Sequence, residues 1–230
     1  MRALRRLALA ASLTVLGAFA APAMAQQILY EPVPPPGSAY LRFVNTLGAE
    51  VTVKPDFLAE RRMGTAPEDR VGGFAVVEKV AGRQLRVELA AGTATGRASL
   101  TIEPGSFNTI LIQPGPGGTL AALPVQDDTA FNQNRARLAF YNAIPGCADG
   151  SLMLEPGKQA VFQGVAPGKA SARSVNPVTA QLLASCGGRS APVFDLKGVE
   201  AGGMYSIWLM QPGGEPLAFV TRDRTLRWQP

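Results

Sequence analysis

The feature that most constrains this chain is a segment that occurs twice. Residues 205–223 read as an apolar strand, a tight Pro-Gly-Gly turn and a returning strand with a polar end, and residues 108–127 repeat that plan. The two Gln-Pro-Gly turns lie 98 positions apart, and a second match, between residues 40–45 and 137–142, has an offset of 97. Two independent matches at nearly one offset predict a domain that was duplicated within the chain.

The pattern between these matches is that of short β-strands. Leu85, Val87 and Leu89 alternate with polar residues, as expected of a half-buried strand. The 19 prolines and 25 glycines are spread over the chain, which is typical of many tight turns, and no stretch outside residues 1–25 has convincing helical periodicity. We therefore predict an all-β fold of two tandem antiparallel β-sandwiches, Ig-like or transthyretin-like in kind, that arose by internal duplication.

Each copy is long enough to bury a core of its own. The polar linker between them is short, so the sandwiches should be close neighbours. The charged stretch at 56–70 is either a long loop or one short helix. We expect a signal peptide at 1–25, an extended proline-rich arm at 26–38, a first sandwich at 39–125, a linker at 126–135, a second sandwich at 136–223 and a tail at 224–230.

The first residues have the features of a secretory signal peptide. Arginines at positions 2, 5 and 6 form a basic start, residues 7–21 are an uncharged apolar run, and Ala-Met-Ala at 23–25 is a small-x-small cleavage site. The apolar run is shorter than the about 20 residues that a retained membrane helix needs, and no cysteine lies near the cleavage site to carry a lipid. We therefore expect an exported protein whose mature chain starts at Gln26 and has no transmembrane segment.

Removal of this segment changes the charge balance. The whole chain has 22 Lys and Arg against 17 Asp and Glu, but three of the arginines belong to the signal peptide, which leaves 19 against 17. The rest of the chain also has no run that is rich in Lys and Arg. We therefore expect no nucleic-acid partner.

Two cysteines, Cys147 and Cys186, fall in the second copy and have no counterparts in the first. In an exported protein such a pair predicts a disulfide. Closing this loop, whose ends lie 39 positions apart, would stabilise the fold by roughly 4 kcal/mol on the chain-entropy account. The alternative is a pair of buried free thiols, whereas a catalytic Cys-x-x-Cys motif is excluded by the spacing.

The chain has no histidine, which excludes several chemistries at once. Ser-His-Asp triads, Cys-His pairs and histidine-based metal sites all need this residue, and the phosphate-loop and dinucleotide fingerprints are missing from the sequence too. The adjacent acids at 127–128 and 68–69 are expected to be solvated charges. A lone serine such as Ser38 or Ser174 would be a poor nucleophile without a base. We therefore predict a non-catalytic protein without a cofactor or bound metal.

Four residues are candidates for contacts with partners: Tyr30 in the proline-rich arm, Arg61 and Arg62 in the charged stretch, and Trp208 in the repeated hairpin. If Ile207 and Leu209 face the core, alternation places Trp208 on the opposite face of its strand. There it either stacks on a sugar or covers the other sandwich, and the short linker favours the second. The arm is either a strap over the first sandwich, which is favoured, or a docking arm. Trp228 in the tail could dock on a partner or on its own domain.

The first mature segment resembles a known family. Residues 29–45 read Leu-Tyr-Glu-Pro-x-x-Pro-x-Gly-Ser-Ala-Tyr-Leu-Arg-Phe-Val-Asn, which is similar to the start of the mature AlgF proteins, the periplasmic accessory components of alginate O-acetylation. Residues 217–222, Leu-Ala-Phe-Val-Thr-Arg, are similar to the end of that family. The signal peptide, the length and the tandem β-rich halves fit the resemblance, whereas the charged stretch and the cysteine pair depart from it.

The resemblance implies a non-catalytic periplasmic accessory or adaptor protein in the O-acetylation of an exopolysaccharide. Its partners would be a membrane acyl-transfer protein and periplasmic O-acetyltransferases, with the exopolysaccharide as a further possible partner. The departures leave the polymer open among alginate, cellulose and other glycans. Each half also resembles a broader class of exported repeats in adhesins and envelope proteins, so the alternative is an envelope adhesin or a glycan-binding sandwich.

Overall fold

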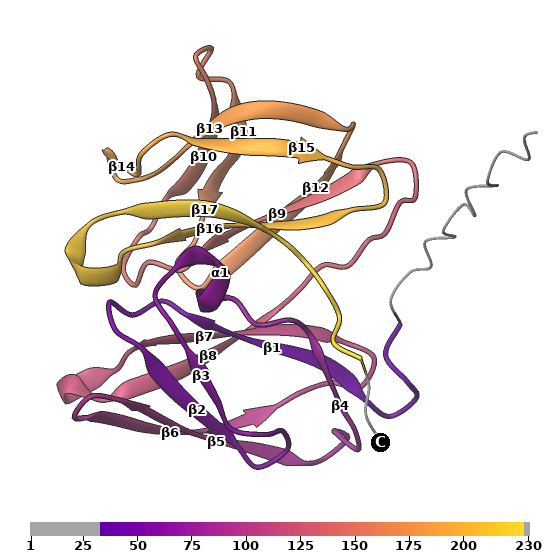
Figure 1. Cartoon of the computed structure of the whole chain (residues 1–230), viewed down its shortest axis with the longest axis vertical. Coiled ribbons are helices and arrows are strands. Elements are labelled where there is room, and N and C mark those ends of the chain that lie inside the picture. The colour runs from indigo at the N-terminus through magenta and orange to yellow at the C-terminus, as the bar shows by residue number, and fades with distance from the viewer. Residues whose placement is uncertain (1–32, 228–230) are drawn as a thin grey trace, which may run out of the picture.

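The computed structural model describes residues 33–227, and their regular secondary structure is almost entirely β-strand, arranged in four sheets. Figure 1 shows the sheets stacked as four layers, with the earlier half of the chain in the lower two and the later half in the upper two. We call the two middle layers the inner sheets and the two outermost layers the outer sheets. The prediction of an all-β fold with two β-sandwiches is confirmed.

The first sandwich contains strands β1 to β8. Its inner sheet has the order β4 (Ala75–Val77), β1 (Ala39–Asn45), β7 (Phe107–Pro114) and β8 (Leu120–Gln126). Its outer sheet has the order β3 (Arg61–Met63), β2 (Val51–Pro55), β5 (Gln84–Ala91) and β6 (Ala94–Thr101).

The second sandwich contains strands β9 to β17. Its inner sheet has the order β12 (Lys169–Val175), β9 (Ala136–Asn142), β16 (Met204–Met210) and β17 (Leu217–Arg222). Its outer sheet is built on β13 (Val178–Cys186), which pairs with β10 (Gly150–Glu155), β14 (Arg189–Ser190) and β15 (Phe194–Val199), and β10 pairs in turn with β11 (Ala160–Val165).

The two inner sheets have the same topology. In each, the first strand of the sandwich pairs in parallel with the strand that opens the repeated hairpin, β1 with β7 and β9 with β16. All other strand pairs within the four sheets are antiparallel. The shared topology agrees with the sequence repeat, and the origin of the repeat by duplication remains a prediction.

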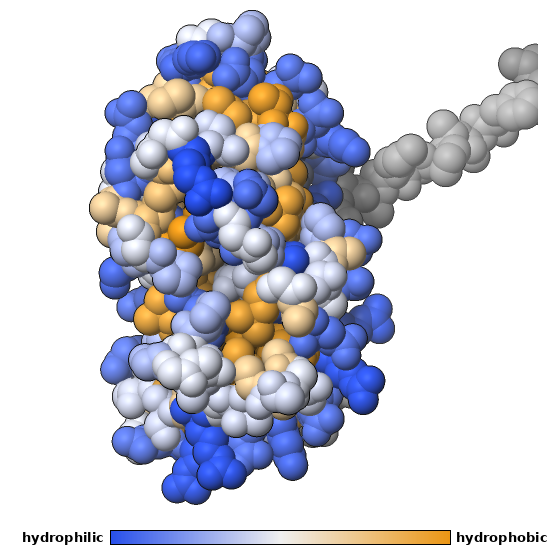
Figure 2. Space-filling view, turned by 90° about the vertical axis from the view of Figure 1, so that its left-hand side faces the viewer, coloured by the Kyte–Doolittle hydropathy of each residue, from blue (hydrophilic) through white to orange (hydrophobic). Residues whose placement is uncertain are grey.

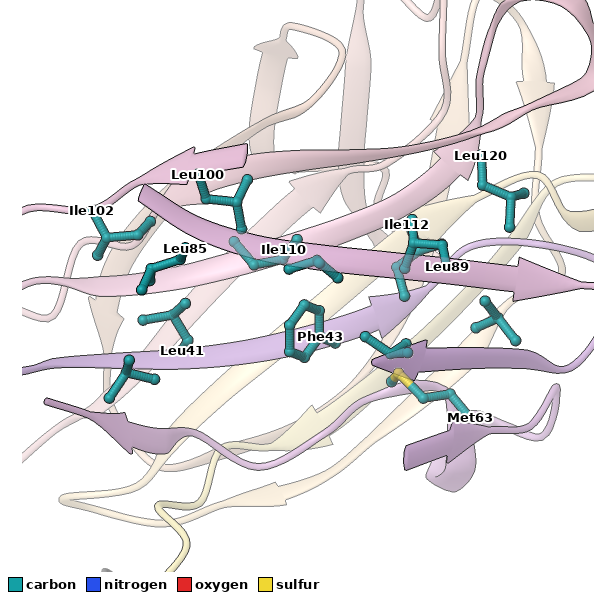
Figure 3. Close-up of a cluster of buried hydrophobic side chains, with 14 of the residues drawn as sticks. Leu41, Phe43, Met63, Leu85, Leu89, Leu100, Ile102, Ile110, Ile112 and Leu120 are labelled. Carbon is teal, nitrogen blue, oxygen red and sulfur yellow. The ribbon is translucent and has the colours of Figure 1, made fainter. Parts of the chain in front are cut away.

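Each sandwich buries one apolar core between its two sheets. In the first core, Leu41 and Phe43 of β1 meet Ile110 and Ile112 of the adjacent strand, and side chains of the outer sheet such as Leu85 close the cluster from the other side (Figure 3). The positions are two apart along each strand, because alternate side chains of a strand point to the same face. The second core repeats this arrangement.

The repeated Pro-Gly turns are short 3₁₀ segments, η1 (Pro116–Gly118) and η2 (Pro212–Gly214). Each needs glycine, because Gly117 and Gly213 adopt φ values of 64° and 70° in the left-handed region that other residues disfavour. In Figure 1 both hairpin turns lie on the left-hand side of the molecule.

The charged stretch folds as more than a loop. It contains the short strand β3 and the single-turn helix α1 (Pro67–Arg70). The guanidinium of Arg70 donates to the backbone carbonyls of Asn45 and Leu47, at 3.0 and 2.7 Å, which holds the helix over the end of β1.

The disulfide between Cys147 and Cys186 is present, with a Cα–Cα distance of 5.8 Å. It joins the loop after β9 to the end of β13, and so it ties the inner sheet of the second sandwich to its outer sheet. The predicted disulfide is therefore confirmed, and the alternative of two buried free thiols is rejected.

Several predictions concern residues beyond the described range. The signal peptide at 1–25, Tyr30 and most of the arm lie outside it, and the described tail stops at Arg227. Among residues 33–227, no helix is both long and apolar enough to cross a membrane.

Candidate functional site

The two sandwiches meet through a second apolar layer, formed by the opposite faces of the inner sheets. This cluster contains Val44, Leu111, Val125, Ala139, Tyr141, Ala143, Trp208, Met210 and Phe219. The central inner strands are therefore buried on both faces, which explains why β9 and β16 are buried along almost their whole length. We call this contact the interdomain interface.

Trp208 belongs to this interface. Its side chain is 0% exposed, and its ring stacks on that of Tyr141 with centroids 4.3 Å apart. Its indole N–H donates to Thr221 Oγ1 at 2.9 Å. Trp208 is thus unavailable to an external partner. The prediction that it contacts a partner was wrong, and the interpretation in which it covers the other sandwich is correct.

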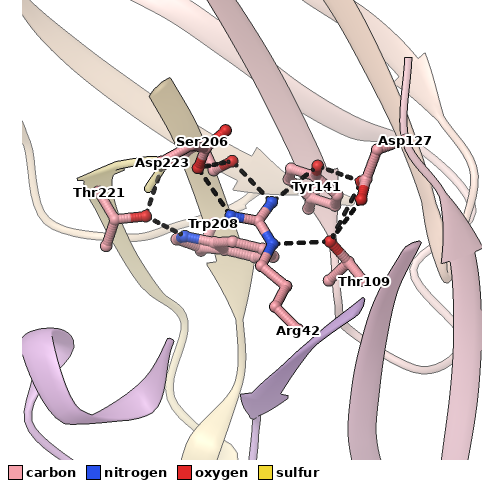
Figure 4. A network of polar contacts seen from close by, with 8 residues as sticks. All are labelled: Arg42, Thr109, Asp127, Tyr141, Ser206, Trp208, Thr221 and Asp223. Atoms are coloured by element: carbon pink, nitrogen blue, oxygen red, sulfur yellow. Dashed lines mark hydrogen bonds and ion pairs between the residues drawn. The ribbon is translucent and has the colours of Figure 1, made fainter. Parts of the chain in front are cut away.

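A buried arginine lies at the centre of the interface. Arg42 of β1 is 1% exposed, and its Nη1 forms an ion pair with Asp223 Oδ1 at 2.7 Å (Figure 4). Its Nε donates to Thr109 Oγ1 at 2.8 Å, and its Nη2 donates to Ser206 Oγ at 2.9 Å and to the Tyr141 hydroxyl at 3.0 Å. One side chain of the first sandwich therefore holds three residues of the second.

A second carboxylate completes this cluster, which we call the Arg42 network. Asp127, at the start of the linker, accepts hydrogen bonds from the hydroxyls of Thr109 and Tyr141. Ser206 in turn donates to Asp223 at 2.7 Å. The expectation that the acids at 127–128 are both solvated was wrong for Asp127, which is 9% exposed. Asp127 directly follows β8, and its N–H donates to the Phe107 carbonyl at 2.9 Å, so it continues the β7–β8 pairing and stays within the interface. Asp128 is exposed.

Aromatic rings enclose the guanidinium. The Cζ atom of Arg42 lies 4.2 Å from the ring centre of Phe74 and 4.9 Å from that of Trp208. Cations attract the π-faces of aromatic rings, and the attraction grows when water is excluded. The buried charge is thus compensated by carboxylates, hydroxyls and rings together, as a buried ion pair requires if it is not to destabilise the fold.

Burial and charge act in opposite directions on these groups. Burial alone would lower the pKa of Arg42, but the nearby Asp223, Tyr141 and Asp127 outweigh it and raise the pKa, so the guanidinium stays charged. Burial raises the pKa of Asp127, although Arg42 and the hydrogen bonds from Tyr141 and Thr109 act the other way. Burial also raises the pKa of Tyr141, so its hydroxyl remains a donor.

The network is nearly symmetric between the two sandwiches. Thr109 pairs with Arg42 across the first inner sheet, and Ser206 pairs with Ala139 across the second, so the two hydroxyls occupy equivalent positions. The two carboxylates likewise stand directly after equivalent hairpins. One arginine thus bridges two copies of the same hydroxyl and carboxylate pair, and Ala139 stands where a second arginine would be.

The Arg42 network is structural, because it is closed to solvent and a substrate could not enter it. Within the described range, no group of three or more Asp, Glu and Cys side chains could hold a metal ion. Ser38 is 1% exposed, and its hydroxyl donates to the Pro35 carbonyl at 2.6 Å, so it is not placed as a nucleophile; Ser174 is only half-buried.

Figure 2 shows one side of the molecule, on which hydrophobic residues (orange) reach the surface in several places between hydrophilic ones (blue). The exposed large hydrophobic side chains are scattered over both sandwiches: Val33, Leu123, Val178, Val193 and Leu226.

A groove of about 580 Å³ lies at one edge of the first sandwich, and we call it the edge groove. Phe43, Phe57 and Leu58 line it together with residues of β4, and the basic side chains at its rim are Arg61, Lys79, Arg83 and Arg227, with Glu78 as the acidic one. Arg61 of the predicted candidates thus lines the groove, and Arg62 is exposed on the same short strand.

The groove exists because two edge strands are short. β4 has three residues, whereas its counterpart β12 in the second sandwich has seven; β3 has three, whereas its counterpart β11 has six. The first sandwich therefore leaves the gap between its sheets open on this side. Residues 57–61, which belong to the charged stretch, supply one wall of the gap.

Comparisons with known proteins add little. No protein-family model matches the chain, and no curated protein matches it. Among solved structures, the chain is similar to the crystal structure of a "putative cell adhesion protein" from Bacteroides uniformis, with 14% identity, 81% of this chain and 99% of the other covered, and a TM-score of 0.25. A TM-score this low supports no conclusion about function.

Proposed function

We propose that this protein is a non-catalytic accessory protein of the cell envelope, exported to the periplasm, that assists separate O-acetyltransferases in the O-acetylation of an exopolysaccharide. The observation that carries the proposal is the Arg42 network. The charged groups of this network bind one another across the interface and hold the two sandwiches together. The outer faces and the edge groove remain as the surfaces that can bind partners. Such a molecule is suited to positioning partners.

Other observations support the proposal. The resemblance of residues 29–45 to the AlgF proteins points to exopolysaccharide acetylation. The disulfide of the second sandwich fits an oxidising compartment such as the periplasm. The sequence contains no histidine base, which agrees with acetyl transfer being carried out by partners.

The basic edge of the first sandwich is the docking surface that we propose for an acetyltransferase component. Arg61 and Arg62 stand on the edge strand β3, and Arg61, Lys79 and Arg83 line the groove. A basic rim favours a partner that presents acidic side chains there, since complementary charge steers association and fixes orientation.

Deletion of the gene tests the function. The polymer should still be made but should lose its O-acetyl groups, as measured by NMR of the purified polysaccharide, and unchanged acetyl content would refute the proposal. Restoring the gene with Arg62→Glu should return less acetylation than the wild type. Arg97→Glu is the matched control, because Arg97 is exposed on the outer sheet, away from the groove rim.

The alternative, an envelope adhesin or a glycan-binding sandwich, rests on the resemblance of each half to exported repeats and on an accessible Trp208, and the structure buries that tryptophan. It predicts direct binding of polysaccharide by the purified protein. Binding of polymer together with unchanged acetylation in the deletion strain would favour it over the accessory function.

A further inference from the structure

The chain after β17 crosses from the second sandwich to the edge of the first, as the yellow ribbon in Figure 1 shows. There the Phe74 N–H donates to the Arg224 carbonyl at 2.9 Å, and the Leu226 N–H donates to the Phe74 carbonyl at 2.7 Å. Thr225 and Phe74 thus form a parallel β-bridge directly before β4 begins. A Cβ atom added at Gly73 would lie 2.8 Å from Leu226 Cδ2, so the chain is closely packed at this point.

This pairing ends before Val76. Among residues 33–227, no backbone hydrogen bond joins residues 224–227 to Val76, and no strand other than β1 pairs with β4. Backbone N–H and C=O groups of a strand alternate between its two edges. Since Phe74 directs its groups to Arg224 and Leu226, Val76 directs its own N–H and C=O to that same side, away from β1. Within the described range, the edge of this inner sheet therefore offers one unpaired donor and one unpaired acceptor at Val76.

The edge groove lies beside these groups, on the face of β4 that carries the first core. Ala75 and Val77 pair with core residues of β1, and they line the groove together with Phe57 and Leu58. Residues two apart on a strand point to the same face of a sheet. A strand added beside Val76 would therefore place every second side chain in the groove, where apolar side chains are favoured.

The lining of the groove also selects by charge. It contains one acidic side chain, Glu78, and several basic ones: Arg61, Lys79, Arg83 and Arg227. Asp56 compensates one of the basic side chains, since it forms an ion pair with Arg83 at 3.6 Å. The remaining excess of positive charge favours an occupant with acidic residues, because complementary charge steers association and fixes orientation.

We propose that the edge groove binds an extended acidic segment of a partner protein, which adds to β4 as a further strand of the inner sheet. The backbone of the segment pairs with the N–H and C=O of Val76, its apolar side chains enter the groove, and the acidic residues that flank them meet the basic rim. In such strand addition, main-chain hydrogen bonds supply affinity and the pockets for alternate side chains supply specificity. The inference deepens the proposed function, on which the identity of the partner as an acetyltransferase component rests.

The second sandwich shows what the added strand would supply. Its inner sheet ends in the seven-residue strand β12, which lies next to β11 of the outer sheet, so the chain itself covers the corresponding gap. The first sandwich has only the three-residue β4 at this place. Exposed strand edges invite pairing with other chains, and charged side chains limit it. The basic rim here disfavours a second copy, which carries the same charge, and admits an acidic partner.

Binding of a synthetic peptide to the purified protein tests the inference without an acetylation assay. The probe is fluorescein-labelled Glu-Asp-Leu-Thr-Val-Asp-Glu, whose binding is followed by fluorescence anisotropy. One control peptide has lysine in place of every acid, and another has N-methyl groups on its central amides, which then cannot donate to the Val76 carbonyl. We expect saturable binding of the probe and affinities at least several-fold weaker for both controls. Absence of saturable binding, or equal affinity for the probe and either control, would overturn the inference.

The outcome of this assay is independent of the test of the proposed function. Failure of the peptide to bind would leave a loss of acetylation in the deletion strain unaffected. Normal acetylation in the deletion strain together with peptide binding would overturn the proposed function and leave the strand-acceptor site in place.

Two pairs of variants show whether the edge of β4 is the location. Val76→Pro removes the outward N–H and spares the pairing with β1, because proline is tolerated at a strand edge whose N–H faces outward. Val76→Ala keeps the N–H and is its matched control, so peptide affinity should be several-fold weaker in Val76→Pro. Lys79→Glu at the rim should likewise weaken binding several-fold, whereas Lys197→Glu, at an exposed position of β15, should not. Equal affinities within either pair would place the peptide elsewhere and overturn the inference.

Hydrogen exchange of the Val76 amide identifies the occupant of the edge. In the free protein this amide should exchange fast, and bound peptide should slow it several-fold while the amides of β16 stay unchanged. Slow exchange in the free protein that becomes fast on truncation after Arg227 would show that the chain's own end occupies the edge. Slow exchange that depends on protein concentration would show a second copy there. Either of these two results would overturn the inference.

Discussion

Removing the charge of Arg42 should destabilise the protein far more than removing any exposed arginine. Arg42→Met keeps a side chain of similar length but deletes the ion pair to Asp223 and the hydrogen bonds to Thr109, Ser206 and Tyr141. Breaking a buried pair by removing one partner leaves an uncompensated charge and costs about 3–5 kcal/mol. That is a large part of the roughly 5–15 kcal/mol by which whole domains are stable.

The loss should depend on pH, because the carboxylates remain in the interface. Burial already raises the pKa of Asp127, and Arg42 opposes that rise, so the pKa of Asp127 climbs further in Arg42→Met. A carboxyl whose pKa is raised in the folded state stabilises the fold at low pH, and this contribution is lost as the pH rises through the folded pKa. The difference between variant and wild type should therefore shrink as the pH falls from 7.

Urea denaturation at several pH values measures both effects. Arg97→Met is the control, since Arg97 and its partner Glu88 are exposed and such pairs contribute about 0–1 kcal/mol. A loss for Arg42→Met no larger than that of the control, or a loss that stays constant with pH, would refute the reasoning that a buried charge network holds the sandwiches together.

Three further predictions concern the same fold. Replacing Cys147 and Cys186 together by serine should lower the free energy of unfolding by about 2–4 kcal/mol, measured by urea denaturation, and a reducing agent should bring the wild type to the same value. Trp208→Ala should cost about 3–5 kcal/mol by the same assay, and a neutral effect would show that its burial contributes little. Combining Arg42→Ala with Ala139→Arg moves the arginine to its equivalent position in the other sandwich. This double variant should regain part of the stability that Arg42→Ala loses, whereas further loss would contradict the symmetry of the network.

The repeat in the sequence predicted much of the fold. The hairpins at 108–127 and 205–223 fold as matching strand pairs, and alternating residues such as Leu41 and Phe43 point into a core as predicted. The disulfide also followed from the cysteine count in an exported chain. These features depend on local sequence patterns and on composition, and both can be read from a single sequence.

The interface was harder to predict because it depends on contacts between distant segments. Arg42 looks like the outward, solvated member of an alternating strand, and Asp127 looks like an ordinary linker acid. Their burial follows from the stacking of two inner sheets, and the parallel pairing of β1 with β7 depends equally on long-range topology. One signal in the sequence could have revealed the network: both repeated hairpins end in an aspartate, Asp127 and Asp223.

The apolar interface and the Arg42 network predict that the two sandwiches tumble as one body. Relaxation of backbone ¹⁵N nuclei in the purified protein tests it most directly, because it reports the rotational correlation time of each sandwich separately. One common correlation time, that of the whole molecule, is the result we predict. Two different and shorter correlation times would show sandwiches that tumble independently and would contradict the claim.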